Sequence, residues 1–138
     1  MHPVVHLHLF NSCGELYLQK RPAWKDIQPG RWDTAVGGHV DWGEEPLAAL
    51  RREVREEVGV TDFEPQHVLT YLFESERERE LVYVYKTVYD GPVVPSGELD
   101  GGRFWTLREI AEGVGGGIFT PNFEGEIRRV AELPDVGR

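Results

Sequence analysis

The sequence predicts a sandwich of the α/β or α+β class, built by residues 1–138 as one domain. Segments rich in β-branched and aromatic residues are interleaved with a few segments of helical periodicity, which is typical of strands and helices packed in layers. Hydrophobic residues make up 40% of the chain, enough for one hydrophobic core. There is no internal repeat and no long linker, so a second domain is not expected.

The expected strands begin at the N-terminal end. Residues 4–10 and 16–19 are rich in large hydrophobic side chains and flank a turn that contains Gly14, which predicts a β-hairpin. Residues 21–33 contain two prolines and a glycine and are expected to form an irregular loop. Further strands are expected over residues 34–40, 68–73 and 81–89, and up to Trp105.

A helix is expected from about Glu45 to Val58. Pro46 suits its first turn, and Gly59 suits a left-handed cap after its last residue. Hydrophobic residues recur at helical spacing and predict one stripe that faces the core, formed by Leu47, Leu50, Val54 and Val58.

Two shorter helices are expected near the C-terminal end. Thr106 and Glu109 form a capping-box sequence, which predicts a helix that starts between them. Thr120 can cap the last helix, with Pro121 in its first position. The residues of this helix that should face inward are Phe123, Ile127 and Val130.

Charge and composition exclude some classes of function. The net charge of −9 makes the protein a poor candidate for binding polymeric nucleic acid, whose phosphates need a basic surface. No run of eighteen hydrophobic residues predicts a membrane span, and the first residues resemble a strand more than a signal peptide. With a single cysteine, Cys13, a reducing cytoplasm is the expected location.

Three carboxylates lie close together on the first predicted helix. At the spacing of Glu53, Glu56 and Glu57, like charges repel by about a few tenths of a kcal/mol per pair. One interpretation is a solvated helix face on which Arg52 and Arg55 offset the repulsion. The other is a site for a hard divalent cation such as Mg²⁺, which takes oxygen ligands and leaves positions for substrate phosphates.

The segment around these glutamates favours the second interpretation. From Gly38 the sequence is Gly-His-Val-Asp-Trp-Gly-Glu, then seven residues, then Arg-Glu-Val-Arg-Glu-Glu-Val-Gly-Val, which ends at Val60. These 23 residues resemble, without a gap, the motif that defines the Nudix hydrolase family. The matching positions are Gly38, Glu44, Arg52, Glu53, Val54, Glu56, Glu57, Gly59 and Val60.

This resemblance implies a fold, a reaction and a set of site residues. The implied fold is a Nudix-like α/β/α sandwich with a mixed β-sheet, and the implied reaction is Mg²⁺- or Mn²⁺-dependent hydrolysis of a diphosphate linkage in a small nucleoside diphosphate derivative or other organic diphosphate. Arg52 would orient a glutamate, and Glu53 or Glu98 would act as general base. The implied metal ligands are the Gly38 carbonyl, Glu53, Glu56 and Glu57.

A second resemblance covers residues 1–60 and is weaker. This part of the sequence is similar to isopentenyl diphosphate isomerase, a branch of the same superfamily. The matching residues are Phe10-Asn11, Gly14, Arg21, Lys25, Pro29-Gly30, Trp32 and Val36 to His39. It implies that Arg21 and Lys25 bind the substrate diphosphate. It also implies a metal site formed by His2, His39, Glu78 and Glu80.

The isomerase activity itself is the less favoured alternative. The catalytic cysteine of that enzyme would fall at Gly37, which has no side chain to move a proton. Hydrolysis is therefore the predicted reaction, and the sequence leaves a homodimer open.

Some further residues are interpreted as structural. His6 and His8 have the alternate spacing of metal ligands on a strand, but no third ligand is identifiable, so both are expected to be structural. The residues Trp24, Trp32 and Trp42 are expected to cover an edge of the core rather than to stack on a nucleobase.

Overall fold

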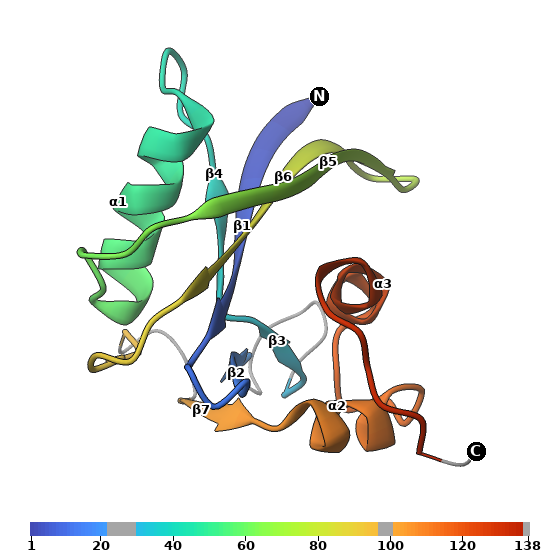
Figure 1. The fold of residues 1–138 in the computed structure, drawn as a ribbon. Helices are drawn as coiled ribbons and strands as arrows, with labels where there is room; N and C mark the ends of the chain where they lie inside the picture. The colour runs from blue at the N-terminus through green and yellow to red at the C-terminus, as the bar shows by residue number, and fades with distance from the viewer. Residues whose placement is uncertain (22–29, 97–100, 137–138) are drawn as a thin grey trace.

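The computed structural model describes residues 1–21, 30–96 and 101–136. These residues form a seven-stranded sheet with helices on both of its sides (Figure 1). The helices are α1 (Pro46–Val58), α2 (Leu107–Gly113) and α3 (Pro121–Val130). The strands are β1 (His2–Phe10), β2 (Leu16–Lys20), β3 (Trp32–Thr34), β4 (Val36–His39), β5 (Gln66–Glu74), β6 (Arg79–Val88) and β7 (Gly102–Trp105). None of the helices in these ranges is long and apolar enough to cross a membrane.

The sheet is mixed, as the family resemblance implied. Its strand order is β3-β2-β1-β6-β5, with β4 paired to β1 and β7 paired to β2. β1 and β6 are parallel along their whole length, whereas the other pairs are antiparallel. The predicted hairpin of β1 and β2 is confirmed, with Leu9 opposite Tyr17.

The strand expected over residues 34–40 contains β4 and only the last residue of β3, because β3 begins at Trp32, where an irregular loop was wrongly expected. β3 ends at Thr34 and pairs with β2, whereas β4 begins at Val36 and pairs with β1. One continuous strand could not make both pairings, so the chain changes partner at Ala35, which is fully buried. This change brings the Gly37-Gly38 backbone alongside the first half of β1.

α1 has the predicted ends. Pro46 occupies its first turn, and Gly59 closes it with a φ of 70°, a conformation that glycine adopts without strain. Leu50, Val54 and Val58 are fully buried, as predicted, but Leu47 is 43% exposed. The inclusion of Leu47 in the buried stripe was therefore wrong, and the fully buried Ala49 packs in the core instead.

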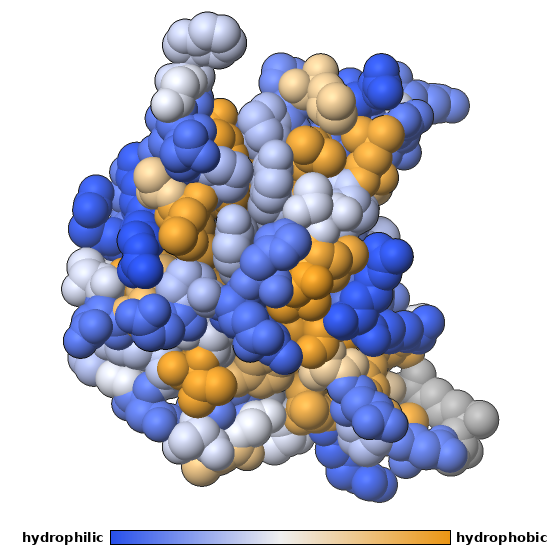
Figure 2. Space-filling view, turned by 45° about the horizontal axis from the view of Figure 1, so that its top comes forward, coloured by the Kyte–Doolittle hydropathy of each residue, from blue (hydrophilic) through white to orange (hydrophobic). Residues whose placement is uncertain are grey.

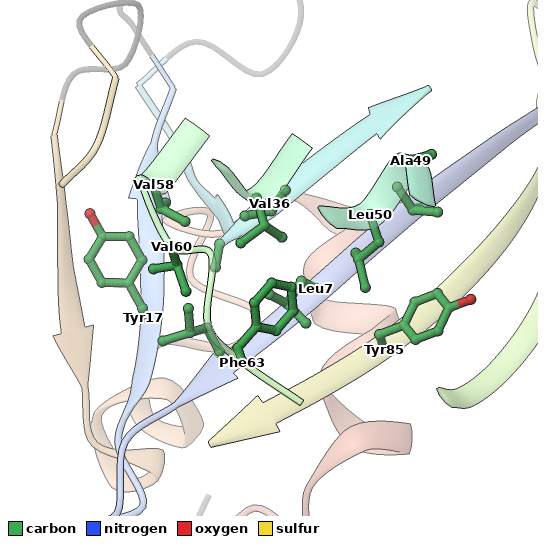
Figure 3. Packing of buried hydrophobic residues seen from close by; sticks show 13 residues of the cluster. Leu7, Tyr17, Val36, Ala49, Leu50, Val58, Val60, Phe63 and Tyr85 are labelled. Carbon is green, nitrogen blue, oxygen red and sulfur yellow. The ribbon is translucent and has the colours of Figure 1, made fainter. Parts of the chain in front are cut away.

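The largest core cluster joins α1 to one face of the sheet. Val5, Leu7 and Leu9, alternate residues of β1, point to this face. Figure 3 shows Leu50 and Val58 of α1 among the side chains that gather here, together with Phe63 and Tyr85. Because this contact buries one side of α1, its glutamates are left at the edge of the sheet.

The opposite face is covered by α3. Thr120 caps this helix by accepting a hydrogen bond from the Phe123 backbone, and Phe123, Ile127 and Val130 are buried, as predicted. The capping box of α2 is also confirmed. One residue of α3 departs from the expected pattern, since Glu126 is only 2% exposed.

The tryptophans fall into different environments. Trp32 packs edge-on against Trp105, with 5.2 Å between the ring centroids, and so covers a core edge as predicted. Trp42 is fully exposed, so the same prediction was wrong for it, and Trp24 lies outside the described residues. The face presented in Figure 2 mixes hydrophilic residues with smaller hydrophobic patches.

Candidate active site

Arg52 joins α1 to the loop that precedes it. Its guanidinium donates to both carboxylate oxygens of Glu44 at 3.0 Å and to the His39 carbonyl at 3.0 Å, and it donates to Glu53 Oε1 at 2.7 Å. The hydrogen bonds from Arg52, followed by one from the Asp41 backbone, lower the pKa of Glu44 to about 2. The two hydrogen bonds to Glu44 fix the direction of the Arg52 guanidinium as well as its distance. Arg52 therefore holds Glu53 in a defined orientation through its hydrogen bond to Oε1.

Gly38 allows Glu53 to approach the sheet. A Cβ atom at position 38 would overlap the carboxyl group of Glu53, which packs directly against the glycine backbone. The Glu53 side chain is only 16% exposed. The glycine is therefore required by the closeness of the carboxylate rather than by its own backbone angles.

Glu57 lies next to Glu53. Its carboxyl group also contacts the Gln19 side chain and the Gly37 backbone, and its Oε2 is buried without a hydrogen-bond partner among the described residues. Burial, and then the hydrogen bond and charge of Glu53, raise the pKa of Glu57 to about 8. Two carboxyl groups this close resist being ionised together unless a cation lies beside them.

These features fit a divalent cation. A buried, unpartnered carboxylate oxygen and a carboxylate packed on a glycine offer the hard oxygen ligands that Mg²⁺ and Mn²⁺ prefer. Glu56 is held less firmly than the other two glutamates. Its side chain is 54% exposed, and its Oε2 lies 3.7 Å from Arg52 Nη1. Over the described ranges, no three His, Cys, Asp or Glu side chains are already grouped around a metal position. Glu56 would have to turn inward to complete the expected set.

A polar cavity of about 240 Å³ lies against the Gly37-Gly38 backbone. A second cavity of about 690 Å³ extends from it toward the turn between β5 and β6. The two share four lining residues and thus form one cleft, which runs from the Gly37-Gly38 backbone of β4 to the first turn of α3. The shared residues are Arg21, Asp33, His39 and Asn122.

The residues expected to bind substrate fall partly within this cleft. Arg21 lines both cavities and lies 3.8 Å from Asp33. Lys25 and Glu98 lie outside the described residues.

Of the four residues implied by the isomerase resemblance, His39, Glu78 and Glu80 line the cleft and His2 does not. His2 and Glu80 are opposite each other in the parallel pair of β1 and β6. The rings of His2 and His39 are 6.5 Å apart, and Glu78 lines the larger cavity. The structure therefore brings three of them to one end of the sheet without forming a grouped metal site from the described residues.

Three residues of the cleft were not predicted as site residues. Gln19 is buried in β2 and links Glu57 to the smaller cavity, and Asn122 enters the cavity from the first turn of α3. His6 lines the same cavity from β1. A polar side chain in an otherwise hydrophobic strand was the available signal for Gln19.

Comparison with known proteins identifies the family. Residues 1–123 match the family described as NUDIX domain. The chain belongs to the Nudix hydrolase family. Its mixed sheet with helices on both faces is the α/β sandwich that the Nudix resemblance implied.

Relatives of this Nudix chain carry both hydrolase and isomerase names. It is 36% identical over 97 residues to an uncharacterized Nudix hydrolase of Pseudomonas aeruginosa, a match that covers 70% of the chain and 57% of that protein. It is 30% identical over 117 residues to the isopentenyl-diphosphate Delta-isomerase of Serratia proteamaculans, which covers 81% of the chain and 64% of the isomerase.

The Nudix fold is also found in solved structures. A crystal structure of a Deinococcus radiodurans protein matches with a TM-score of 0.79 and 26% identity, over 93% of this chain and 82% of that one.

The chain spans less than two thirds of the length of the two sequence relatives.

Proposed function

We propose that this protein hydrolyses the diphosphate linkage of a small nucleoside diphosphate derivative or another organic diphosphate, with Mg²⁺ or Mn²⁺ as cofactor. The observation that carries the proposal is the pair of adjacent carboxyl groups of Glu53 and Glu57, which lie at Gly38 beside a polar cavity. Membership of the Nudix hydrolase family supports the same reaction.

The metal would be held by Glu53, Glu56, Glu57 and the carbonyl of Gly38. A bound divalent ion would neutralise charge on the phosphate oxygens and make an attacking water more acidic. Before the ion binds, the high pKa of Glu57 favours a proton on its carboxyl group. Metal binding therefore has to displace that proton, which makes the affinity for the ion fall as the pH falls.

The other roles belong to side chains around the carboxylates. Arg52 holds Glu53, which would orient the attacking water or accept its proton. Glu98 is an alternative general base. Arg21, and Lys25 with it, would bind the substrate phosphates, because guanidinium and ammonium groups pair with phosphate oxygens.

Replacement of Glu57 tests the proposal. We expect Glu57→Gln to lower turnover by about 100-fold or more, since it removes a charged ligand while preserving side-chain shape. Turnover is measured as released phosphate or nucleoside monophosphate on a panel of nucleoside diphosphate derivatives, with Mg²⁺ or Mn²⁺. Glu112→Gln is the matched control, because Glu112 is an exposed residue of α2. Full activity of the Glu57 variant would reject the assignment.

A separate reaction tests the alternative, isomerisation of isopentenyl diphosphate. The likeness to an isomerase at 30% identity motivates it. Gly37, at the position of the isomerase cysteine, argues against it. We expect no allylic isomer in NMR spectra of a reaction with isopentenyl diphosphate, and its appearance at enzymatic rates would favour the alternative.

A further inference from the structure

A buried carboxylate of α3 is held by three side chains of the sheet. Glu126 Oε2 accepts hydrogen bonds from His6 Nδ1 at 2.6 Å and from the Tyr71 hydroxyl at 2.5 Å. Glu126 Oε1 lies 2.9 Å from His8 Nε2. The four side chains come from three segments far apart in the sequence, β1, β5 and α3, and the proposed hydrolysis has no role for any of them.

The charge of this cluster is set by Glu126. Burial alone would raise the pKa of its carboxyl group, but the hydrogen bonds and charges of His6 and His8 lower it below its usual range, so Glu126 is a carboxylate. Its ion-pair partners among the described residues are these two histidines. A buried carboxylate is stable only with a countercharge.

His6 is the histidine placed to supply that countercharge. Burial alone would lower the pKa of His6, but Glu126 offsets this effect and raises it above its ordinary value, with smaller contributions from Asp33 of β3 and Glu80 of β6. Tyr71, on β5, keeps its proton, because burial and Glu126 raise its pKa.

The two histidines differ in what their rings face. His8 is fully buried, and its ring stacks on that of Phe123, with 6.2 Å between the ring centroids. His6 lines the polar cavity at the Gly37-Gly38 backbone, and its side chain is 16% exposed. Because Glu126 occupies Nδ1 of His6, Nε2 is the nitrogen left for a ligand. The Nε2 edge of the ring lies against Gly37, where a Cβ would be 3.7 Å from Nε2.

We propose that His6 is a substrate-binding residue, which donates its Nε2–H to a phosphate oxygen of the diphosphate, and that Glu126 is the residue that positions it. The inference rests on the proposed function, since it assigns a contact for the same diphosphate. Arg21 lines the same cavity, so a phosphate there would lie between the Arg21 guanidinium and the His6 ring, whose protonated form is favoured by Glu126. Both groups form strong, charge-assisted hydrogen bonds with phosphate.

The carboxylates that also line the cavity leave room for this contact. Asp33 accepts hydrogen bonds from the Thr120 hydroxyl at 2.9 Å and the Thr34 backbone at 2.7 Å, and it lies 3.8 Å from Arg21. Its charge is thus partly offset by its own neighbours. Glu80 is at the far end of the strand pair, opposite His2.

The wild-type protein tests the contact directly, with inorganic pyrophosphate and Mg²⁺ as the probe. In spectra of the ¹⁵N-labelled imidazoles, we expect the His6 Nε2 resonance to shift as pyrophosphate binds. His67 serves as the internal reference, because it is exposed on β5 and bonds Thr70 of its own strand. An unchanged His6 resonance at saturating pyrophosphate, or no binding of pyrophosphate, would overturn the proposal.

Variants test the strength of the contact. We expect His6→Gln to weaken pyrophosphate binding by about tenfold or more, as for loss of one charge-assisted hydrogen bond, and His67→Gln to leave it unchanged. Glu126→Gln should weaken binding and lower the pKa of His6 in the same NMR experiment, a change that a purely structural role of Glu126 in packing would not produce. Wild-type affinity in His6→Gln would overturn the proposal.

These outcomes separate the inference from the proposed function. If Glu57→Gln abolishes turnover while His6→Gln binds pyrophosphate normally, hydrolysis stands and the role of His6 falls. If no substrate of the panel is hydrolysed while pyrophosphate binding depends on His6, the phosphate site stands and the hydrolase assignment falls.

Discussion

Gly38 positions a carboxylate by having no side chain. The carboxyl group of Glu53 occupies the space that a Cβ atom of residue 38 would fill. Because residue 38 is glycine, β4 and α1 can lie this close together. The neighbouring Glu57 depends on the same spacing, because its carboxyl group contacts both Glu53 and the Gly37 backbone.

We therefore expect Gly38→Ala to lower the free energy of unfolding by about 1–3 kcal/mol, as for other overpacked sites, and to weaken Mg²⁺ binding. Gly125→Ala is the matched control. Position 125 lies within α3 with open space around it, and alanine there should raise the free energy of unfolding by about 0.5–1 kcal/mol. Urea denaturation measures both effects, and equal stability of the two variants would contradict the explanation.

The contact of His6 and His8 with Glu126 could not be predicted from the sequence. The spacing of His6 and His8 was noted, but both were predicted to be structural because no third partner could be identified for them. The partner, Glu126, is more than a hundred positions away, and only the packing of α3 on β1 brings them together. Glu126 stands in the helical stripe of Phe123 and Ile127, and a charge in that stripe was the signal of a buried contact.

At the scale of elements, local signals predicted most ends of helices. The capping box of α2 is complete: the Glu109 backbone donates to the Thr106 hydroxyl at 3.0 Å, and the Thr106 backbone donates to the Glu109 carboxylate at 2.9 Å. Such signals need only the residues within one turn, so they can be identified from the sequence alone.

We expect Thr106→Ala to cost about 1 kcal/mol of unfolding free energy, because it leaves a backbone donor of α2 without its cap. Thr61→Ala, at an exposed position before β5, is the control and should change stability by less than about 0.5 kcal/mol. Thermal unfolding measures the difference, and a Thr106 variant as stable as the control would show that the cap contributes nothing.

The sequence predicted where strands form better than which strands pair with each other. The segments that became β1, β5 and β6 were identified by their composition, but composition does not say which strands are neighbours. The division between β3 and β4 was missed for the same reason, since it follows from two different partners rather than from a turn signal in residues 34–36.

At the scale of the whole molecule, the link between Glu126 and His6 couples stability to pH. The lowered pKa of Glu126 gives stability that is present above about pH 4.5, the unshifted value, and is lost as the pH falls. The raised pKa of His6 gives stability that is fully present below pH 6.5 and is lost as the pH rises through its folded-state value.

We therefore expect the difference in unfolding free energy between the wild type and Glu126→Gln to be greatest between about pH 4.5 and 6.5, the unshifted values of the two groups. It should shrink on either side of this range. Urea denaturation across the pH range measures it. A difference that is constant with pH would mean that Glu126 contributes through packing and not through its charge.

The parallel alignment of β1 with β6 has a consequence for synthesis in the cell. The strand that completes the hydrogen bonds of β1 is translated well after it, because four strands and α1 lie between β1 and β6 in the sequence. Until then the nascent polypeptide carries a hydrophobic strand with an unsatisfied edge, which is a template for misassociation with other chains. Synthesis of the segment between these two strands is thus a period in which the exposed edge of β1 can pair with another chain.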